Sequence, residues 1–226
     1  FRGSNTKSFI HEAWVLYNLI EVFEPKQVFG LWYLTENSIE WREGYLFPKR
    51  FYHTPYSGKK GPEGPLRSVI PHIKIIQKTG NIIYIGYQNS FHLYRPDFSI
   101  YLRFRDIKLR NIKNRIDVVF DDKIMTSICF DNKSGFWYIE NYNFSPDVVV
   151  EAKESKSALT SKIRSNIKKY KEMFPNTKII VVCPEKIEET KLNGCFFVLD
   201  TFDKELLEKR KCDKNKFQDR LRQVIF

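Results

Sequence analysis

The stretch Pro146-Asp147-Val148-Val149-Val150-Glu151-Ala152-Lys153-Glu154-Ser155 predicts a buried strand that ends on an acid and a base. Side chains alternate along a strand, so Glu151 and Lys153 project to the same face with their backbones roughly 6 to 7 Å apart. Ionised groups are normally excluded from such an apolar strand, so packing alone explains the pair poorly. The pair instead suggests metal-dependent phosphodiester chemistry, with a cross-strand surface ion pair as the alternative.

The segments around this strand predict a compact α/β core. Apolar residues recur at helical spacing over 6–23 and over 157–174, and the second of these segments is basic on its other face. Continuous apolar runs at 178–183 and 195–199 are typical of strands buried on both faces. A basic helix is predicted over about 203–223.

The region between the first helix and the acid–lysine strand is rich in β-forming residues. The segment 27–52 favours short strands or helical turns. The predicted strands after it are 81–87, 91–94, 98–104, 116–120 and 136–140, the last two as a hairpin extension of the same sheet. Residues 53–67 contain three prolines, three glycines and three basic residues, which predicts a basic surface loop.

Composition sets the outer limits. The 226 residues, 42% apolar and 15% aromatic, can bury a full core as one domain, with or without a large insertion. The 38 basic and 27 acidic residues leave a net charge of +11, which favours a polyanionic partner, nucleic acid first and an anionic membrane second. The chain lacks any run of 18 apolar residues and any signal-peptide pattern. We therefore expect a soluble, cytoplasmic protein with reduced cysteines and no membrane partner.

The chain starts at Phe1-Arg2-Gly3-Ser4 without an initiator methionine. We expect residues 1–4 to be a cloning remnant and the chain to be a fragment of a larger protein.

A second carboxylate is needed near Glu151 if the strand is to bind a metal ion. Asp147 lies roughly 13 Å away along the strand, which is too far to share one ion, and Ser-Pro-Asp is ordinary strand-entry chemistry. A neighbouring strand must supply the partner. Asp97, which opens its own strand, is the best-placed candidate, with Asp117 and Asp121 as alternatives.

Glu12 is a candidate third ligand, because it flanks the apolar stripe of the first helix; the alternative is a solvated helix charge. Mg²⁺, for which Mn²⁺ would substitute, needs oxygen ligands and open positions for water and phosphate. Glu12, Asp97 and Glu151 fit that count, and the backbone carbonyl of Ala152 could add a neutral ligand. The metal would polarise the phosphate and activate water, while Lys153 would neutralise the phosphate or orient the nucleophile.

Asp97 followed by Glu151-Ala152-Lys153 resembles the catalytic signature of the PD-(D/E)xK nuclease superfamily. More narrowly, these residues together with 11–17 (HEAWVLY) and 94–97 (YRPD) resemble the nuclease domain of McrC-like proteins. Those proteins are partners of McrB-type GTPases in modification-dependent restriction. The resemblance covers about residues 7–183. The 53 residues between Asp97 and Glu151 exceed the usual interval, which implies an inserted hairpin.

The resemblance implies an α/β fold with a restriction-endonuclease-like core, in which helices flank a central mixed β-sheet that carries β-rich insertions. Residues 5–226 would form a single nuclease domain, with the β-rich insertion at about 27–94, the catalytic core at about 95–199 and the basic helix at the end. By resemblance Asp97 and Glu151 are metal ligands, Lys153 is the catalytic lysine, and Glu12 takes the helix-borne acidic position. Tyr170 matches a helix tyrosine, either as a core aromatic or in DNA positioning.

The resemblance further implies a Mg²⁺-dependent DNA endonuclease, a phosphodiester hydrolase within a larger antiviral restriction assembly that includes a GTPase or ATPase motor of the McrB type. The expected nucleic-acid contacts are Lys59, Lys60, Arg67, Lys156, Asn166 and Tyr170. Asn166 stands where some relatives have glutamine. A non-catalytic nucleic-acid-binding module of the same fold and a nuclease that acts on RNA are the alternatives.

Overall fold

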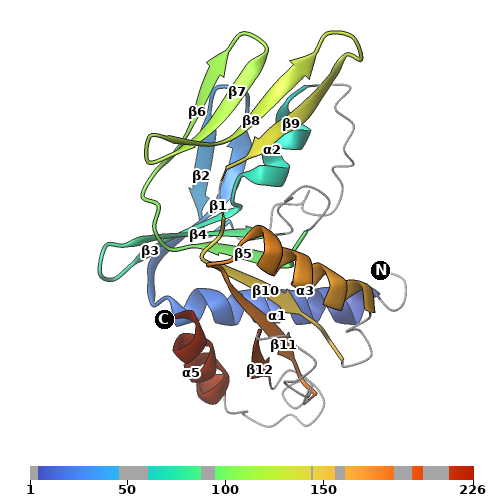
Figure 1. Ribbon diagram of the computed structural model, residues 1–226. Coiled ribbons are helices and arrows are strands. Elements are labelled where there is room, and N and C mark those ends of the chain that lie inside the picture. The colour runs from blue at the N-terminus through green and yellow to red at the C-terminus, as the bar shows by residue number, and fades with distance from the viewer. Residues whose placement is uncertain are drawn as a thin grey trace. The chain divides into compact units, whose positions relative to one another are not determined.

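The computed structural model describes residues 5–45, 61–87, 95–143, 145–155, 161–185, 195–200 and 214–226. The chain is a mixed α/β structure with a large mixed sheet flanked by helices, in agreement with the predicted α/β class (Figure 1). It divides into two compact units. The first unit comprises Phe1–Glu24, Pro96–Phe98 and Asp147–Phe226, and the second unit comprises Pro25–Arg95 and Ser99–Pro146.

The first unit is built on a parallel run of strands in the order β12-β11-β10. Its elements are α1 (Asn5–Val22), β10 (Val148–Ala152), α3 (Ser161–Met173), β11 (Lys178–Cys183), β12 (Phe196–Leu199) and α5 (Lys214–Ile225). Val148 of β10 pairs with Lys178 of β11, and the register runs on to Ala152 and Val182. All five residues of β10 are buried, as expected for a parallel strand covered on both faces.

The helices of the first unit are held by a mixture of apolar and polar contacts. Helix α1 buries an apolar stripe that includes Val15, Leu16 and Leu19, and it packs against α5. Trp14 stacks on Phe217 of α5 with ring centroids 4.8 Å apart. Two further contacts tie α1 in place: His11 Nε2 lies 2.8 Å from Asp200 Oδ2, with both side chains fully buried, and Gln218 donates to Asn18.

The second unit is β-rich. In the large sheet it contributes strands in the order β5-β4-β3-β1-β2, of which β5 begins at Phe98 in the first unit. The bounds are β1 (Pro25–Leu34), β2 (Ile39–Glu43), β3 (Ile73–Gln77), β4 (Ile82–Tyr87) and β5 (Phe98–Tyr101). A separate antiparallel sheet has the order β6-β7-β8-β9, with bounds β6 (Ile107–Ile112), β7 (Arg115–Phe120), β8 (Lys123–Asp131) and β9 (Phe136–Tyr142).

Two predictions for the second unit need correction. The predicted hairpin at 116–120 and 136–140 does not extend the large sheet, because β7 and β9 pair on either side of β8 in the separate four-stranded sheet. The predicted loop 53–67 does not run through to Arg67. Helix α2 (Glu63–Val69) begins after Pro62 and buries Pro65, Leu66 and Val69, which provide the apolar contacts that a loop would lack.

Most of the other predicted elements are present with shifted ends. The helix expected at 6–23 is α1, and the strands expected at 178–183 and 195–199 are β11 and β12. The predictions for 91–94, for 53–60, for the start of the second helix at 157–160 and for 203–213 lie outside the described residues. Within the part of the chain that the structure describes, no helix is both long and apolar enough to cross a membrane.

Candidate active site

The end of strand β10 positions the acid and the lysine. Glu151 is the fourth residue of β10 and is paired with Val181 in the parallel register. The backbone N–H of Lys153 donates to Val182 O at 2.9 Å, so the extended pairing continues past the end of β10. Glu151 and Lys153 therefore face the same way, as the alternation of strand side chains requires. The Lys153 Nζ lies 2.9 Å from Glu151 Oε2.

Asp97, the residue immediately before β5, is in contact with this pair. Its Oδ2 accepts a hydrogen bond from the Ala152 backbone N–H at 2.8 Å and another from Lys153 Nζ at 2.6 Å. The backbone contact matters because it fixes the Asp97 carboxylate to the end of β10 independently of the lysine. Three predicted residues, Asp97, Glu151 and Lys153, thus lie in one cluster within the first unit.

Tyr170 of α3 completes the cluster from the helix side. Its hydroxyl donates to Glu151 Oε1 at 3.0 Å, and the residue is fully buried. The sequence left open whether Tyr170 is a core aromatic or a contact with DNA. The structure shows a buried ring whose hydroxyl donates a hydrogen bond to Glu151. Because Glu151 accepts from Tyr170 through Oε1 and from Lys153 through Oε2, both of its oxygens are oriented.

The electrostatics of the cluster are unbalanced, because two buried carboxylates share one ammonium group. Burial raises the pKa of Glu151 to about 7, with a further contribution from the charge of Asp97, and these effects outweigh Lys153 and Tyr170, which lower the pKa. Burial alone would lower the pKa of Lys153, but the carboxylates of Asp97 and Glu151 raise it above its ordinary value. The lysine therefore stays charged at neutral pH while Glu151 titrates there.

The other predicted ligands are placed differently. Glu12 is half-buried on α1 and accepts a hydrogen bond from Ser8 Oγ at 3.4 Å. Among the described residues no group of three or more His, Cys, Asp or Glu side chains could hold a metal ion, so the expected set of Glu12, Asp97 and Glu151 is not assembled. Ala152 contributes its N–H to Asp97; a role for its carbonyl oxygen as a ligand stays a prediction.

The alternative carboxylates have contacts of their own in the second unit. Asp117 is buried against Arg115 and Ser127, and Asp121 accepts hydrogen bonds from the backbone N–H groups of Arg105 and Asp106. Asp147, assigned to strand entry, accepts a hydrogen bond from Lys178 N at 3.0 Å through its backbone carbonyl. These contacts leave Asp97 as the partner of Glu151.

The predicted nucleic-acid contacts are described only in part. Arg67 is half-buried in the last turn of α2, and Asn166 is half-buried on α3, one helical turn before Tyr170. Lys59, Lys60 and Lys156 lie outside the described residues. Sequence reasoning missed the hydroxyl contact of Tyr170 with Glu151, although the position of Tyr170 on the apolar stripe of its helix indicated an inward side chain.

No protein-family model matches the chain. No curated protein and no solved structure is significantly similar to it.

Proposed function

We propose that this chain is the cleavage domain of a metal-dependent nuclease with a restriction-endonuclease-like core, which hydrolyses phosphodiester bonds in DNA with Mg²⁺ as its cofactor and Mn²⁺ as a substitute. The observation that carries the proposal is the buried cluster in which Asp97 and Glu151 share the ammonium of Lys153. With two carboxylates and one ammonium group, the cluster has an excess of negative charge that a bound cation would offset.

The residues present fit a magnesium ion. Mg²⁺ is commonly bound through one or two carboxylates, with water and substrate phosphate in its remaining positions, so Asp97 and Glu151 suffice as protein ligands. The Lys153 ammonium, at 2.6 and 2.9 Å from the two carboxylates, shows that both can reach a single cation. When bound, such an ion polarises a phosphate and lowers the pKa of a bound water.

The side chains of the cluster have separate tasks in this proposal. Asp97 and Glu151 bind the cation, while Tyr170 orients the Glu151 carboxylate through its hydroxyl. Lys153 is 12% exposed and sits on a long flexible stem, so its ammonium can turn from the carboxylates toward a phosphate oxygen. There it would offset the charge that develops during phosphoryl transfer.

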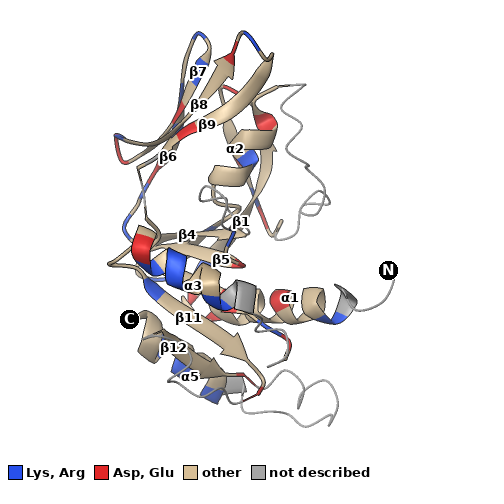
Figure 2. Ribbon diagram, turned by 45° about the vertical axis from the view of Figure 1, so that its right-hand side comes forward, with Lys and Arg blue, Asp and Glu red and all other residues tan. Residues whose placement is uncertain are grey.

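The surface of α3 supports a polyanionic substrate. Arg164, Lys168 and Lys169 are exposed on this helix, whereas Ile167 and Tyr170 are buried. Figure 2 shows basic positions along α3. Exposed basic residues that follow the cluster along the chain would bind a phosphate backbone without reading its sequence. The proposal extends, by the resemblance to McrC-like proteins, to a larger antiviral restriction assembly in which a GTPase or ATPase motor of the McrB type supplies target choice.

Cleavage assays with matched variants test the proposal. The purified chain, in excess over plasmid DNA and with Mg²⁺ or Mn²⁺, is expected to cut it, and a chelator should stop the reaction. Asp97→Ala, Glu151→Ala and Lys153→Ala should each lower the rate by at least about 100-fold, since each removes a charge that acts at the reacting phosphate. Asp117→Asn, which alters a buried carboxylate outside the cluster, should retain activity.

Full activity in all three cluster variants, each shown by circular dichroism to be folded, would overturn the proposal. Calorimetric titration with Mn²⁺ separates catalysis from a purely binding role, because a non-catalytic module would bind DNA with a strong salt dependence and leave Asp97 and Glu151 without metal affinity. The same assay with RNA decides between the two nucleic acids.

A further inference from the structure

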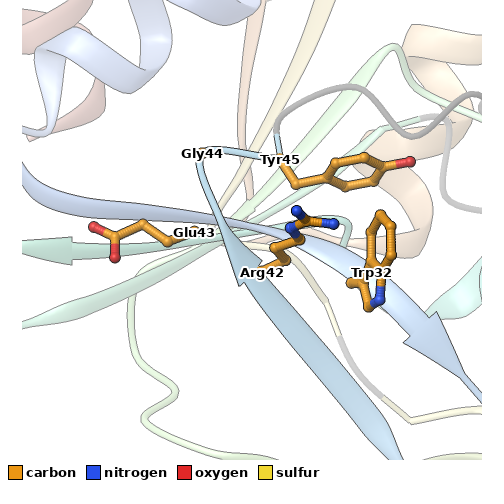
Figure 3. Close-up of a pocket in the computed structure, with 5 residues that line it drawn as sticks. All are labelled: Trp32, Arg42, Glu43, Gly44 and Tyr45. Atoms are coloured by element: carbon orange, nitrogen blue, oxygen red, sulfur yellow. The ribbon is translucent and has the colours of Figure 1, made fainter.

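A cavity of about 490 Å³ lies on the β1–β2 hairpin of the second unit, and nothing in the proposed cleavage chemistry uses it. It is lined by Trp32, Arg42, Glu43, Gly44 and Tyr45. Figure 3 shows the side chains of Trp32, Arg42 and Tyr45 gathered on one side of the hairpin, whereas Glu43 points away from them. Its volume lies within the range of small-molecule sites in proteins.

The backbone departs from regular strand geometry at the residues that build this cavity. The pairing of β1 with β2 shifts between Leu31 and Tyr33, so Trp32 is the extra residue of a β-bulge. Bulges re-aim a side chain and are common beside functional sites. Gly44 has φ +71°, a conformation that favours glycine, and it turns the chain toward Tyr45.

Gly30 provides room for this turn. A Cβ atom at Gly30 would lie 1.4 Å from the backbone oxygen of Tyr45, so only glycine lets the chain after β2 cross so close to β1. The bulge at Trp32 and the two glycines, Gly30 and Gly44, shape the same part of the hairpin backbone. Together they bring the Tyr45 ring to Trp32.

The aromatic group is ordered before any ligand arrives. Trp32 is 45% exposed, and its ring meets the Tyr45 ring edge-on, with centroids 4.8 Å apart and an interplanar angle of 87°. The Arg42 guanidinium carbon lies 4.4 Å from the Trp32 ring centroid. The Arg42 guanidinium lies over the Trp32 ring, and the indole is still nearly half exposed, so its uncovered part offers a stacking surface next to a cation.

Of the two charged residues that line the pocket, Arg42 lies at the Trp32 ring and Glu43 points away from it (Figure 3). The Arg42 guanidinium would repel a cationic ligand. Residues 25–95 and 99–146, the second unit, contain 18 Lys and Arg and 10 Asp and Glu, so they carry eight of the chain's net eleven positive charges. A nucleotide combines a flat base with a negative phosphate, and aromatic rings with arginine are the usual platform for unpaired bases.

We propose that the Trp32–Arg42–Tyr45 pocket binds one unstacked base of a single-stranded nucleic acid. This inference rests on the nucleic-acid partner of the proposed function and adds to it a second site, remote from the cleavage chemistry in sequence. The base stacks on the indole of Trp32, Tyr45 holds that ring in place, and Arg42 contacts the base edge or the adjoining phosphate.

Binding of a fluorescently labelled single-stranded oligonucleotide to the full chain tests the pocket, measured by anisotropy in EDTA so that no metal-dependent cleavage occurs. Trp32→Ala is expected to weaken binding by roughly 5- to 100-fold, the effect of losing one stacked base. Trp32→Phe keeps a ring and should restore most of the affinity. Tyr33→Ala removes the neighbouring side chain, which is 50% exposed but does not line the cavity, and should leave affinity unchanged.

Two further arms identify the ligand. An oligonucleotide with abasic positions should bind wild type and Trp32→Ala equally, since it offers no base to stack. Duplex DNA should be nearly insensitive to Trp32→Ala, because its bases are already stacked. Arg42→Ala should weaken binding and lower the slope of log affinity against log salt by up to about one unit if Arg42 contacts a phosphate.

Equal affinity of wild type and Trp32→Ala for the single strand, or an equal loss in Tyr33→Ala, overturns this inference; a peptide-binding pocket would give the first of these results. Because the assay contains no divalent cation, it is independent of the cleavage test. If Trp32→Ala weakens binding but the wild-type chain does not cleave DNA, the pocket is supported and the nuclease is not. If the wild-type chain cleaves DNA but Trp32→Ala binds the single strand as tightly as wild type, the nuclease is supported and the pocket is not.

Discussion

Two buried acids of the described chain, one in each unit, are paired with a base two residues away in the sequence. In the first unit, Glu151 and Lys153 stand at the end of β10, and in the second, Arg115 and Asp117 lie on β7. Both acids are buried and both pairs are in contact: Lys153 Nζ lies 2.9 Å from Glu151, and Arg115 Nε lies 2.7 Å from Asp117. Strand alternation produces the same local arrangement in both places.

The neighbouring elements make the two pairs chemically different. In the second unit the Ser127 hydroxyl donates to Asp117 at 2.7 Å and accepts from Arg115 at 2.8 Å. Arg115 also lies 3.5 Å from Glu140, a second carboxylate that is 42% exposed. In the first unit the neighbour is Asp97, a second carboxylate. Each base thus meets two carboxylates. In the first unit both carboxylates are at most 10% exposed, whereas in the second unit Glu140 and Arg115 are more than 40% exposed, so water screens their charges. An acid–base pair therefore indicates a site for a further cation only when the excess negative charge beside it is buried.

The largest expected difference between the pairs is the effect of removing the base. Lys153→Met leaves two buried carboxylates without their cation and should lower the unfolding free energy by about 3 to 5 kcal/mol at pH 8. Arg115→Met should cost clearly less, because the Arg115 side chain is 43% exposed and water can reach the position that it leaves. Urea unfolding at pH 8 measures both. An equal loss in the two variants would contradict the distinction.

The next difference is in pH dependence without metal. The pKa of Glu151 is about 7 in the folded chain, against an ordinary 4.5, so the folded state binds this proton more tightly than the unfolded state. The resulting stability is fully present below about pH 4.5 and is lost as the pH rises through about 7. Glu151→Gln should thus be more stable than wild type at pH 8, by about 2 to 3 kcal/mol, with little difference near pH 4.5.

Thermal or urea unfolding in EDTA between pH 4.5 and 8.5 measures this dependence. Asp117→Asn is the control, because Asp117 is a buried carboxylate outside the Asp97–Glu151–Lys153 cluster, and this variant should keep the pH dependence that Glu151→Gln removes. If Glu151→Gln shows the same pH profile as wild type, Glu151 does not titrate in the way described.

The smallest expected effect is stabilisation by a divalent cation. At ten times its dissociation constant, Mn²⁺ or Mg²⁺ should raise the unfolding free energy by about 1.4 kcal/mol if it binds only the folded chain. Asp97→Asn should abolish this increase, whereas Asp117→Asn should preserve it. An increase that survives in Asp97→Asn would place the cation elsewhere in the chain.

The predictability of the fold varied with how polar each strand is. The valine run of β10 and the apolar run of β11 were recognisable because strands buried on both faces carry few polar residues. Strands β6 and β8 were missed. Thr126 and Ser127 interrupt the apolar run in the middle of β8, yet both are buried in the sheet, where the Thr126 hydroxyl donates to Asn141 O and the Ser127 hydroxyl to Asp117.

The predictability of the site varied with how clear a local sequence signal each residue has. Asp97 was identified as the partner of Glu151 because a residue at a strand mouth is well placed to reach a neighbouring strand, and the structure brings the two together. The prediction for Glu12 relied on the direction of a helix face and on the resemblance of residues 11–17, and neither determines a distance in this chain. The aromatic pocket gave no periodic signal, because it depends on a β-bulge at Trp32 and on the close approach permitted by Gly30.

The sequence by itself determined that Glu151 and Lys153 face one way at the end of a buried strand, because strand side chains alternate whatever surrounds them. Only the tertiary structure decided what that pair became. Asp97 and Tyr170 meet it through strand order and helix packing, which no local pattern specifies. The same two-residue spacing yields a different ion pair at Arg115 and Asp117, because there the base and its second carboxylate, Glu140, are exposed to water.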